Sequence, residues 1–300
     1  MKNYEKKSSF KTVVAIGKFD GVHLGHKKLI ETAVEISKEN NCKSLVYIVA
    51  PDGHSMILPD NQRRETFENL GADFIFKENF TREFMAMSPE EFVKNILADK
   101  LNCACVVVGY DFRFGSGRCA DAAELSRLCQ IAGIRTVVIN EVRVEGHDGI
   151  GRTVSSSLIR KFIKAGDFKN ANLYLGYDFS LVGKVCVGRQ LGRTIGIPTA
   201  NVIPGSDVPE IKSGVYATLC TTECGEFLSI TNIGNNPTVG EGNPITVETN
   251  IFGFSGNLYG KKIKITFLKR LRGEEKFSSL LALKAQIEKD KQYVLKKYGK

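Results

Sequence analysis

The feature that constrains this chain most is a glycine-rich turn between an apolar run and an amphipathic segment. The turn reads Gly17-Lys18-Phe19-Asp20-Gly21-Val22-His23-Leu24-Gly25-His26. Residues 13–16 before it are typical of a buried strand in a parallel sheet, and residues 29–34 after it keep helical spacing of apolar side chains. Such a strand-to-helix turn presents backbone N–H groups and the positive end of the helix dipole to an anion. The sequence therefore predicts a nucleotide phosphate site, the alternative being a tight turn without a ligand.

The two histidines of the turn, His23 and His26, strengthen the phosphate interpretation. The chain has only 4 histidines, and these two stand three residues apart at the expected start of the helix. Their ring nitrogens can add donors aimed at the same anion. The pattern His-x-Gly-His at a helix start is similar to the signature of nucleotidylyltransferases, in which the histidines hold the phosphates of ATP.

The bulk composition is that of a globular protein with room for two domains, because the chain has 300 residues and 42% of them are hydrophobic. No apolar run approaches the ~20 residues of a membrane span. Residues 1–7 lack the apolar core of a signal peptide, so we expect a cytoplasmic protein with no membrane partner. We expect a monomer or a weak homo-oligomer.

The net charge of +9 indicates a field that attracts anions, either nucleotides or nucleic acid. Much of the excess lies in the C-terminal segment, where lysines are typical of a solvated helix face. Because no recognisable DNA- or RNA-reading element accompanies this charge, we expect no nucleic-acid partner.

The 8 cysteines do not form a metal or disulfide pattern. No C-x-x-C pair occurs, and no histidine stands near enough to a cysteine pair to complete a zinc spacing. The sequence predicts free, mostly buried thiols.

The order of expected elements divides the chain in two. Strand-like runs at 44–49, 73–76, 105–108 and 136–139 alternate with helical patterns, one of them opened by Ser88 as N-cap and Pro89 at the first position. This alternation predicts an α/β doubly wound parallel sheet, with ligands at the carboxyl ends of the strands.

After about Gly176, short strand-like runs follow one another, and a final helix is expected near 278–298. This pattern favours an antiparallel barrel or sandwich. The expected domains are 1–178 and 179–300.

Two further motifs of the first half point to the predicted sheet edge. Asp111 and Arg113 follow the strand at 105–108, so they are candidates for binding ribose or base and phosphate; the alternative is a loop whose aromatic residues pack as a lid. Ser155 and Ser156 can cap a second helix that carries Arg160 one turn in, the alternative being a capped helix with a surface arginine.

The three motifs of the first half, taken in order, resemble the adenylyltransferase half of the bacterial bifunctional riboflavin kinase/FAD synthetase family. The second half resembles the same family's kinase around Pro198-Thr199-Ala200-Asn201, and further motifs follow in the family's order. These are Gly214-Val215-Tyr216, Asn232-Ile233-Gly234, Val247-Glu248-Thr249-Asn250, Leu258-Tyr259-Gly260, Arg272 and Phe277.

The resemblance implies a nucleotidylyltransferase-like, Rossmann-like domain followed by an antiparallel barrel with a C-terminal helix. It implies that riboflavin is phosphorylated to FMN and that FMN is then adenylylated to FAD, with ATP as co-substrate and Mg²⁺ as cofactor. By resemblance, Glu248 is the base of the kinase and Thr199 binds Mg²⁺, with Asn201 as a further metal or phosphate ligand. Phosphoryl transfer needs such groups for positioning, charge neutralisation and proton acceptance.

The remaining site residues are also assigned by the resemblance. In the adenylyltransferase, His23 and His26 contact the phosphates, while ATP-binding residues are Gly17, Phe19, Asp20, Gly21, Gly25, Asp111, Arg113, Ser155, Ser156 and Arg160. In the kinase, the ATP- or flavin-binding residues are Gly192, Arg193, Thr199, Asn201, Gly214, Tyr216, Asn232 and Arg272.

One segment departs from the family's pattern: the stretch after the second strand, which includes His54, is shortened. Four alternatives remain open at this stage. They are an enzyme that only phosphorylates riboflavin, a nucleotidylyltransferase for another phosphorylated alcohol, a non-catalytic flavin-binding regulator and a basic nucleic-acid binder.

Overall fold

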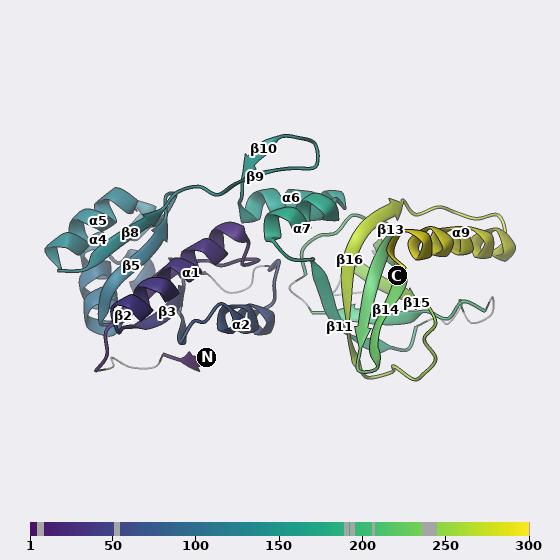
Figure 1. Ribbon diagram of the computed structural model, residues 1–300, viewed down its shortest axis with the longest axis horizontal. Coiled ribbons are helices and arrows are strands. Elements are labelled where there is room, and N and C mark those ends of the chain that lie inside the picture. Colours follow the sequence, from purple (N-terminus) through teal and green to yellow (C-terminus); the bar gives the residue numbers. More distant parts are fainter. Residues whose placement is uncertain are drawn as a thin grey trace. The chain divides into compact units, whose positions relative to one another are not determined.

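The computed structural model describes residues 1–4, 9–50, 55–188, 192, 196–205, 208–235 and 245–299. Its contacts divide the chain into two compact units (Figure 1). The first unit comprises Met1–Glu145 and Gly151–Ser156, and the second comprises Gly146–Ile150 and Ser157–Lys300.

The first unit is built on a six-stranded sheet in which every neighbouring pair is parallel. The strand order is β1-β4-β3-β2-β5-β8. In chain order the strands are β1 (Lys2–Asn3), β2 (Thr12–Gly17), β3 (Lys43–Ile48), β4 (Phe74–Lys77), β5 (Cys103–Gly109) and β8 (Arg135–Ile139). The expectation of a doubly wound parallel sheet is confirmed.

The central strands are buried on both faces because helices cover both. Val14, Ile16 and Tyr47 pack on one face with Phe92 and other apolar side chains. The helix α1 (Leu24–Glu39) contacts β2, β3 and β5 through its own apolar residues, which lie outside that cluster. Strands with both faces buried read as continuous apolar runs, which is why residues 13–16 and 105–108 were recognisable.

The other helices of this unit are short, and Ser88 begins one of them as predicted. They are α2 (Asp60–Asn69), α3 (Arg82–Ala86), α4 (Pro89–Glu91), the π-helix η1 (Phe92–Lys100), the 3-10 helix η2 (Ser116–Arg118) and α5 (Ala122–Ile131). Ser88 forms a capping box with Glu91, which satisfies two backbone N–H groups at that end. Two small sheets complete the unit, β6 (Arg113–Phe114) with β7 (Ala120–Asp121) and β9 (Arg143–Glu145) with β10 (Gly151–Thr153).

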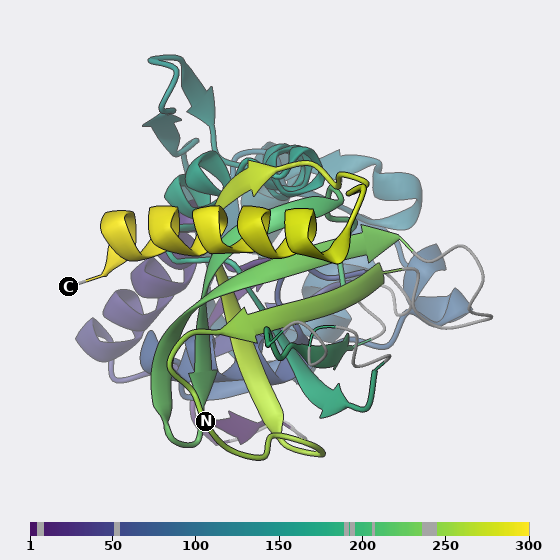
Figure 2. The same ribbon diagram turned by 90° about the vertical axis from the view of Figure 1, so that its right-hand side faces the viewer.

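The second unit is a closed antiparallel barrel, as expected (Figure 2). Its strands are β11 (Ser180–Cys186), β12 (Ala200–Pro204), β13 (Gly214–Thr222), β14 (Gly225–Asn235), β15 (Ile245–Ile251) and β16 (Lys262–Arg272). The strand order is β11-β12-β15-β14-β13-β16. The helix α9 (Leu280–Tyr298) contacts β14, and its Val294 packs on Val215, Ala217 and Ile230.

Two helices ahead of the barrel, α6 (Ser156–Ala165) and α7 (Phe168–Leu175), belong almost entirely to the second unit. Phe168 of α7 packs on Phe179, Tyr216 and Phe267, with ring centroids 5.4, 5.4 and 4.6 Å away. These contacts join α7 to the barrel. The two compact units divide at 156/157, apart from Gly146–Ile150, which group with the second unit, whereas the sequence predicts a domain boundary at 178/179.

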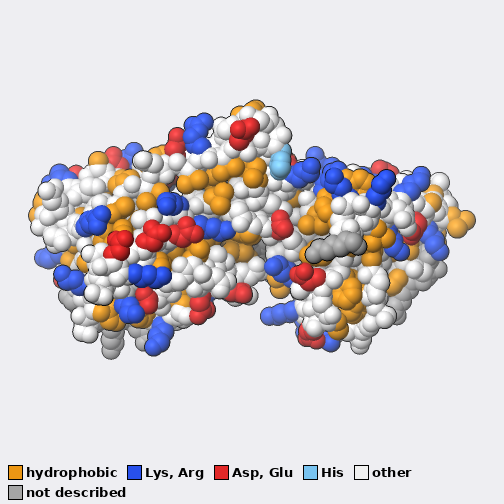
Figure 3. Space-filling view, in the orientation of Figure 1, with side chains coloured by type: hydrophobic (Ala, Val, Ile, Leu, Met, Phe, Trp, Pro, Cys, Tyr) orange, Lys and Arg blue, Asp and Glu red, His pale blue; other side chains and the backbone are white. Residues whose placement is uncertain are grey.

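All eight cysteines are free, with Cys103, Cys105, Cys129 and Cys220 buried. In the described ranges no helix is long and apolar enough to cross a membrane. On the face drawn in Figure 3, Lys and Arg side chains lie among Asp and Glu side chains on both units.

Candidate functional site

The first candidate site is the turn between β2 and α1. Phe19 and Val22 have φ of 52° and 37°, a left-handed region that side chains other than glycine rarely adopt. The Phe19 ring is fully buried, and a Cβ added to Gly17 would lie 3.1 Å from it. Packing therefore holds the turn in a backbone conformation that is costly by itself, as is common where a chain binds ligands.

The two imidazoles of the turn are stacked, with ring centroids 3.7 Å apart. His23 is the N-cap of α1, and its Nδ1 accepts the backbone N–H of His26 at 3.3 Å. The Nδ1 of His26 is buried and has no hydrogen-bond partner among the described residues. A buried polar atom without a partner is a group that a ligand or water can satisfy.

Both imidazoles are neutral at neutral pH. Burial lowers the pKa of His23 to about 4, against the opposing effect of Asp20. Burial also lowers the pKa of His26 well below its usual range, and the neighbouring His23 and Arg63 lower it further. The approach of a polyphosphate favours the protonated forms, so this site can take up protons together with an anion.

These depressed pKa values predict acid-sensitive stability. The His23 pKa is about 4 when folded and 6.5 by its usual value, so the unfolded chain binds the proton first. The contribution of the neutral His23 to the free energy of unfolding is complete above pH 6.5 and is lost as the pH falls towards 4. Its size is roughly 3 kcal/mol. Urea titration of the full chain across this range measures it. His23→Asn should flatten the dependence, whereas a matched change at the exposed His147 should not.

Asp20 and Ser156 are brought together although they are far apart in the chain. The Ser156 hydroxyl donates to the Asp20 carbonyl at 2.9 Å, and an Asp20 carboxylate oxygen accepts the backbone N–H of Ile57 at 2.8 Å. Gly21, with φ of 78°, and Gly25, where an added Cβ would lie 3.3 Å from the His23 ring, complete this turn. Ser155 belongs to the same unit, whereas Arg160 belongs to the second.

Asp111 and Arg113 follow β5, the neighbour of β2, so they lie at the same carboxyl edge of the sheet as the turn. Both side chains are exposed, and Arg113 Nη1 lies 3.7 Å from an Asp121 carboxylate oxygen. Phe112 and Phe114 stack at 5.6 Å beside them. The polar side chains of this motif are thus exposed at the sheet edge, whereas its two phenylalanines stack on each other.

The second candidate site lies on the outside of the barrel. Glu248 of β15 stands in register with Asn201 on one neighbouring strand and Asn232 on the other. Val247 and Thr249, the residues on either side of it, are buried in the barrel, whereas Glu248 itself is exposed. Since side chains alternate along a strand, the carboxylate and the two amides share the outer face.

Thr199 is held next to this row by its neighbours. It precedes β12, two residues before Asn201, and the Asn250 side chain donates to the Pro198 carbonyl at 2.7 Å. The Asn201 amide also packs closely against Gly188, where an added Cβ would overlap it, so a larger residue at 188 would force the amide to move. The Thr199 hydroxyl and the Asn201 amide oxygen are oxygen donors of the kind that Mg²⁺ accepts.

The other residues expected at the kinase site are two glycines in close backbone contacts, a buried tyrosine and an arginine outside the described residues. A Cβ on Gly214 would lie 2.4 Å from the Arg272 carbonyl, so Gly214 allows a close approach of two strands, whereas an added Cβ on Gly192 would meet the Ile197 carbonyl at 2.2 Å. Tyr216 is fully buried, and its hydroxyl donates to the Lys212 carbonyl. Arg193 and His54 lie outside the described residues.

Arg272 is fixed by the C-terminal helix. Its Nε lies 2.9 Å from an Asp290 carboxylate oxygen, and its guanidinium lies 5.6 Å from the centre of the Phe277 ring. Just beyond it, Glu274 lies 3.5 Å from the Asn232 amide, a second carboxylate beside the row that the sequence did not single out.

Asp290→Ala should destabilise the barrel by about 3 kcal/mol, because it leaves the largely buried Arg272 guanidinium unpaired. A urea titration of the full chain measures the change. Glu288→Ala, an exposed position on the same helix, is the matched control and should stay near wild type. An Asp290→Ala protein as stable as the control would contradict a structural role for this ion pair.

Two family models match the chain: FAD synthetase over residues 5–158 and riboflavin kinase over residues 175–298. Proteins named bifunctional riboflavin kinase/FMN adenylyltransferase match nearly the whole chain. The Buchnera aphidicola (Schizaphis graminum) protein is 34% identical, covering 98% of this chain and 96% of its own length. The Bacillus subtilis protein is 33% identical, covering 98% and 95%.

A solved Streptococcus pneumoniae structure described as a macrolide-efflux protein shares the architecture, with a TM-score of 0.85, 25% identity and 98% coverage of both chains. The matched motifs, the parallel sheet and the closed barrel agree with the two family models and with the curated relatives. The chain therefore belongs to the bifunctional riboflavin kinase/FMN adenylyltransferase family.

Proposed function

We propose that this protein makes FAD from riboflavin in two ATP-dependent steps. The second half, 179–300, transfers the γ-phosphoryl group of ATP to riboflavin, which yields FMN and ADP. The first half, 1–178, joins FMN to the adenylyl group of a second ATP and releases pyrophosphate. The observation that carries the proposal is that His23 and His26 stack on one unit, while Asn201, Glu248 and Asn232 lie in register on the other, and these are residues that we assign to the two reactions.

The adenylyl transfer needs no nucleophile from the protein, because the FMN phosphate itself attacks the α-phosphorus of ATP. The protein has to align the two phosphates and stabilise charge as pyrophosphate leaves. We assign His23, His26 and the backbone N–H groups at the start of α1 to the ATP phosphates. Asp111, Arg113, Ser155, Ser156 and Arg160 are assigned to the rest of the nucleotide and the leaving group.

In the kinase, Glu248 is the base that accepts the proton of the terminal ribityl hydroxyl as this oxygen attacks the γ-phosphorus. Its exposed position between two amides leaves the carboxylate open to a substrate. Thr199 and Asn201 would hold Mg²⁺, which neutralises charge on the ATP phosphates when bound. Arg272, fixed by Asp290, is assigned to the flavin or ATP.

We assign both reactions to a cytoplasmic enzyme, because both consume ATP. Its partners are riboflavin, FMN, FAD and ATP, without nucleic acid or membrane, and it acts as a monomer or a weak homo-oligomer.

Chromatography of flavins tests the proposal. Purified protein is incubated with riboflavin and MgATP, and separately with FMN and MgATP, and the products are separated with time. FMN should appear first in the riboflavin reaction and FAD afterwards, and FAD should form directly from FMN. FMN without FAD would limit the enzyme to the kinase, and bound flavin without turnover would indicate a regulator.

A further inference from the structure

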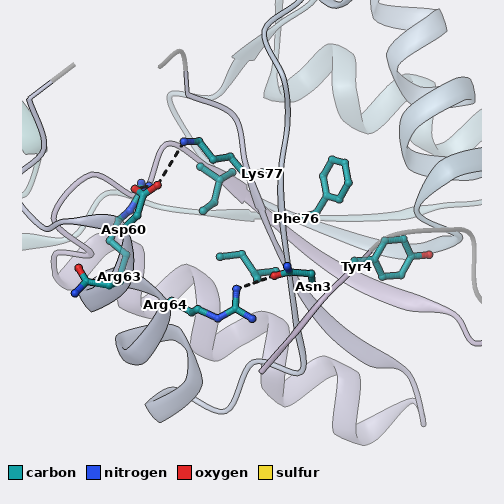
Figure 4. A pocket seen from close by; sticks show the side chains of 10 residues that line it. Asn3, Tyr4, Asp60, Arg63, Arg64, Phe76 and Lys77 are labelled. Carbon is teal, nitrogen blue, oxygen red and sulfur yellow. Dashed lines mark hydrogen bonds and ion pairs between the residues drawn. The ribbon is translucent and has the colours of Figure 1, made fainter. Parts of the chain in front are cut away.

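The helix α2 carries a buried arginine that neither the sequence motifs nor the family resemblance singled out. Arg63 is 2% exposed, and its Nη1 donates to the Lys18 carbonyl at 3.1 Å. Its Nη2 forms an ion pair with Asp60, and within the described residues its Nε has no hydrogen-bond partner. Figure 4 shows Asp60, Arg63 and Arg64 among the residues that line a pocket, with Lys77 reaching Asp60. The volume of this pocket is about 560 Å³.

Burying this guanidinium is costly, and its contacts do not offset the cost in full. A buried charge needs a well-shielded partner and hydrogen bonds for all its donors. Here the partner carboxylate of Asp60 is 61% exposed and is shared with Lys77, which lies 3.4 Å away. A contribution to the stability of the fold therefore does not by itself explain why an arginine is buried at position 63.

The carbonyl that Arg63 holds belongs to the ATP-binding turn. Lys18 immediately precedes Phe19, the residue with φ of 52°. The Phe19 ring in turn packs edge-on against His26 at 5.2 Å and against Phe67 of α2 at 5.6 Å. The helix α2 thus holds the turn at two points, by the arginine to its backbone and by Phe67 to its ring.

The charge of Arg63 also acts on the imidazole pair. After burial and the neighbouring His23, Arg63 is the third cause that lowers the pKa of His26. The other charged and titratable groups on this pair are His23 itself and Asp20, which opposes the effect of burial on the His23 pKa. The arginine therefore bears on both the shape and the charge of the site.

We propose that Arg63 is a positioning residue for adenylyl transfer, which fixes the Lys18 carbonyl and thereby the turn that presents His23 and His26 to ATP. The proposal rests on the proposed function of the first half. It requires no contact between Arg63 and substrate, because the guanidinium acts through the backbone of the turn.

The test compares Arg63→Gln, Arg63→Lys and the matched control Arg64→Gln in the full-length chain. Arg64 occupies the next position on α2 but binds Asn3 and the Met1 carbonyl instead of the turn. We expect kcat/KM for ATP in FAD formation to fall by about 10²-fold in Arg63→Gln, since small misplacements of reacting groups cost that much. Arg63→Lys should recover part of this loss, and Arg64→Gln should stay within about twofold of wild type.

Riboflavin phosphorylation by the same protein should stay at the wild-type rate in every variant, because its residues lie in the other unit. NMR titration of the histidines provides a second readout: the His26 pKa should rise in Arg63→Gln and stay low in Arg63→Lys. Normal FAD formation by Arg63→Gln, or an equal loss of both activities in Arg63→Lys, would overturn the proposal. A wild-type protein that made no FAD would instead reject the proposed function.

Discussion

Glu248→Gln should reduce FMN formation from riboflavin by about 10²–10⁴-fold, the usual contribution of a general base. Glutamine keeps the size of the side chain and its place between Asn201 and Asn232, but its amide oxygen is a far weaker proton acceptor. Because the change removes only the proton acceptor, kcat should fall far more than the KM for riboflavin rises. Initial rates of FMN formation, measured by chromatography at saturating MgATP, provide the test.

The control for this variant is Glu226→Gln, at an exposed position on β14. The Glu226 carboxylate accepts a hydrogen bond from the Thr221 hydroxyl at 3.1 Å. FAD formation from supplied FMN should remain normal in both proteins, because it takes place in the other unit. A Glu248→Gln protein that made FMN at the wild-type rate would remove Glu248 from the role of base.

His26→Ala should reduce the formation of FAD from FMN by about 10²–10³-fold, as expected for the loss of a preorganised phosphate donor. His26 is chosen because its buried Nδ1 has no partner among the described residues and can be satisfied by a ligand. The loss should appear in kcat as well as in KM for ATP, because charge shifts among the phosphates during transfer.

The exposed His147 supplies the matched histidine-to-alanine control. His147→Ala should leave both activities unchanged, and His26→Ala should leave riboflavin phosphorylation intact. If His26→Ala formed FAD at the wild-type rate, the imidazole pair would not be part of the adenylyl-transfer site.

The sequence was sufficient to predict the central strands of the parallel sheet, because β2, β3 and β5 are buried almost throughout and stand between recognisable helices. It did not reveal α2, whose ten residues include a single apolar side chain, Phe67. That helix is held by tertiary contacts such as Arg63 to Lys18, and contacts between distant segments leave no periodic pattern.

The same limit applies to the sites. The turn at 17–26 is local, so its glycines and histidines were visible together in the sequence. The row across the barrel joins Asn201, Asn232 and Glu248 from three strands, and only the register of those strands brings them side by side. Tyr216 is an expected binding residue on its motif alone, and only the structure shows that its ring is buried against Phe168 and Phe267.

The seating of Phe168 against the barrel has a consequence for how such an enzyme can be divided or recombined. The stretch 159–174, which neither family model covers, contains most of α6 and α7, and α7 closes an aromatic cluster on the kinase side. A chimaera that replaced the first half up to residue 178 would also remove Phe168 from the core of the second unit. We therefore expect chimaeras joined at the start of α6 to be more stable than chimaeras joined at 178/179.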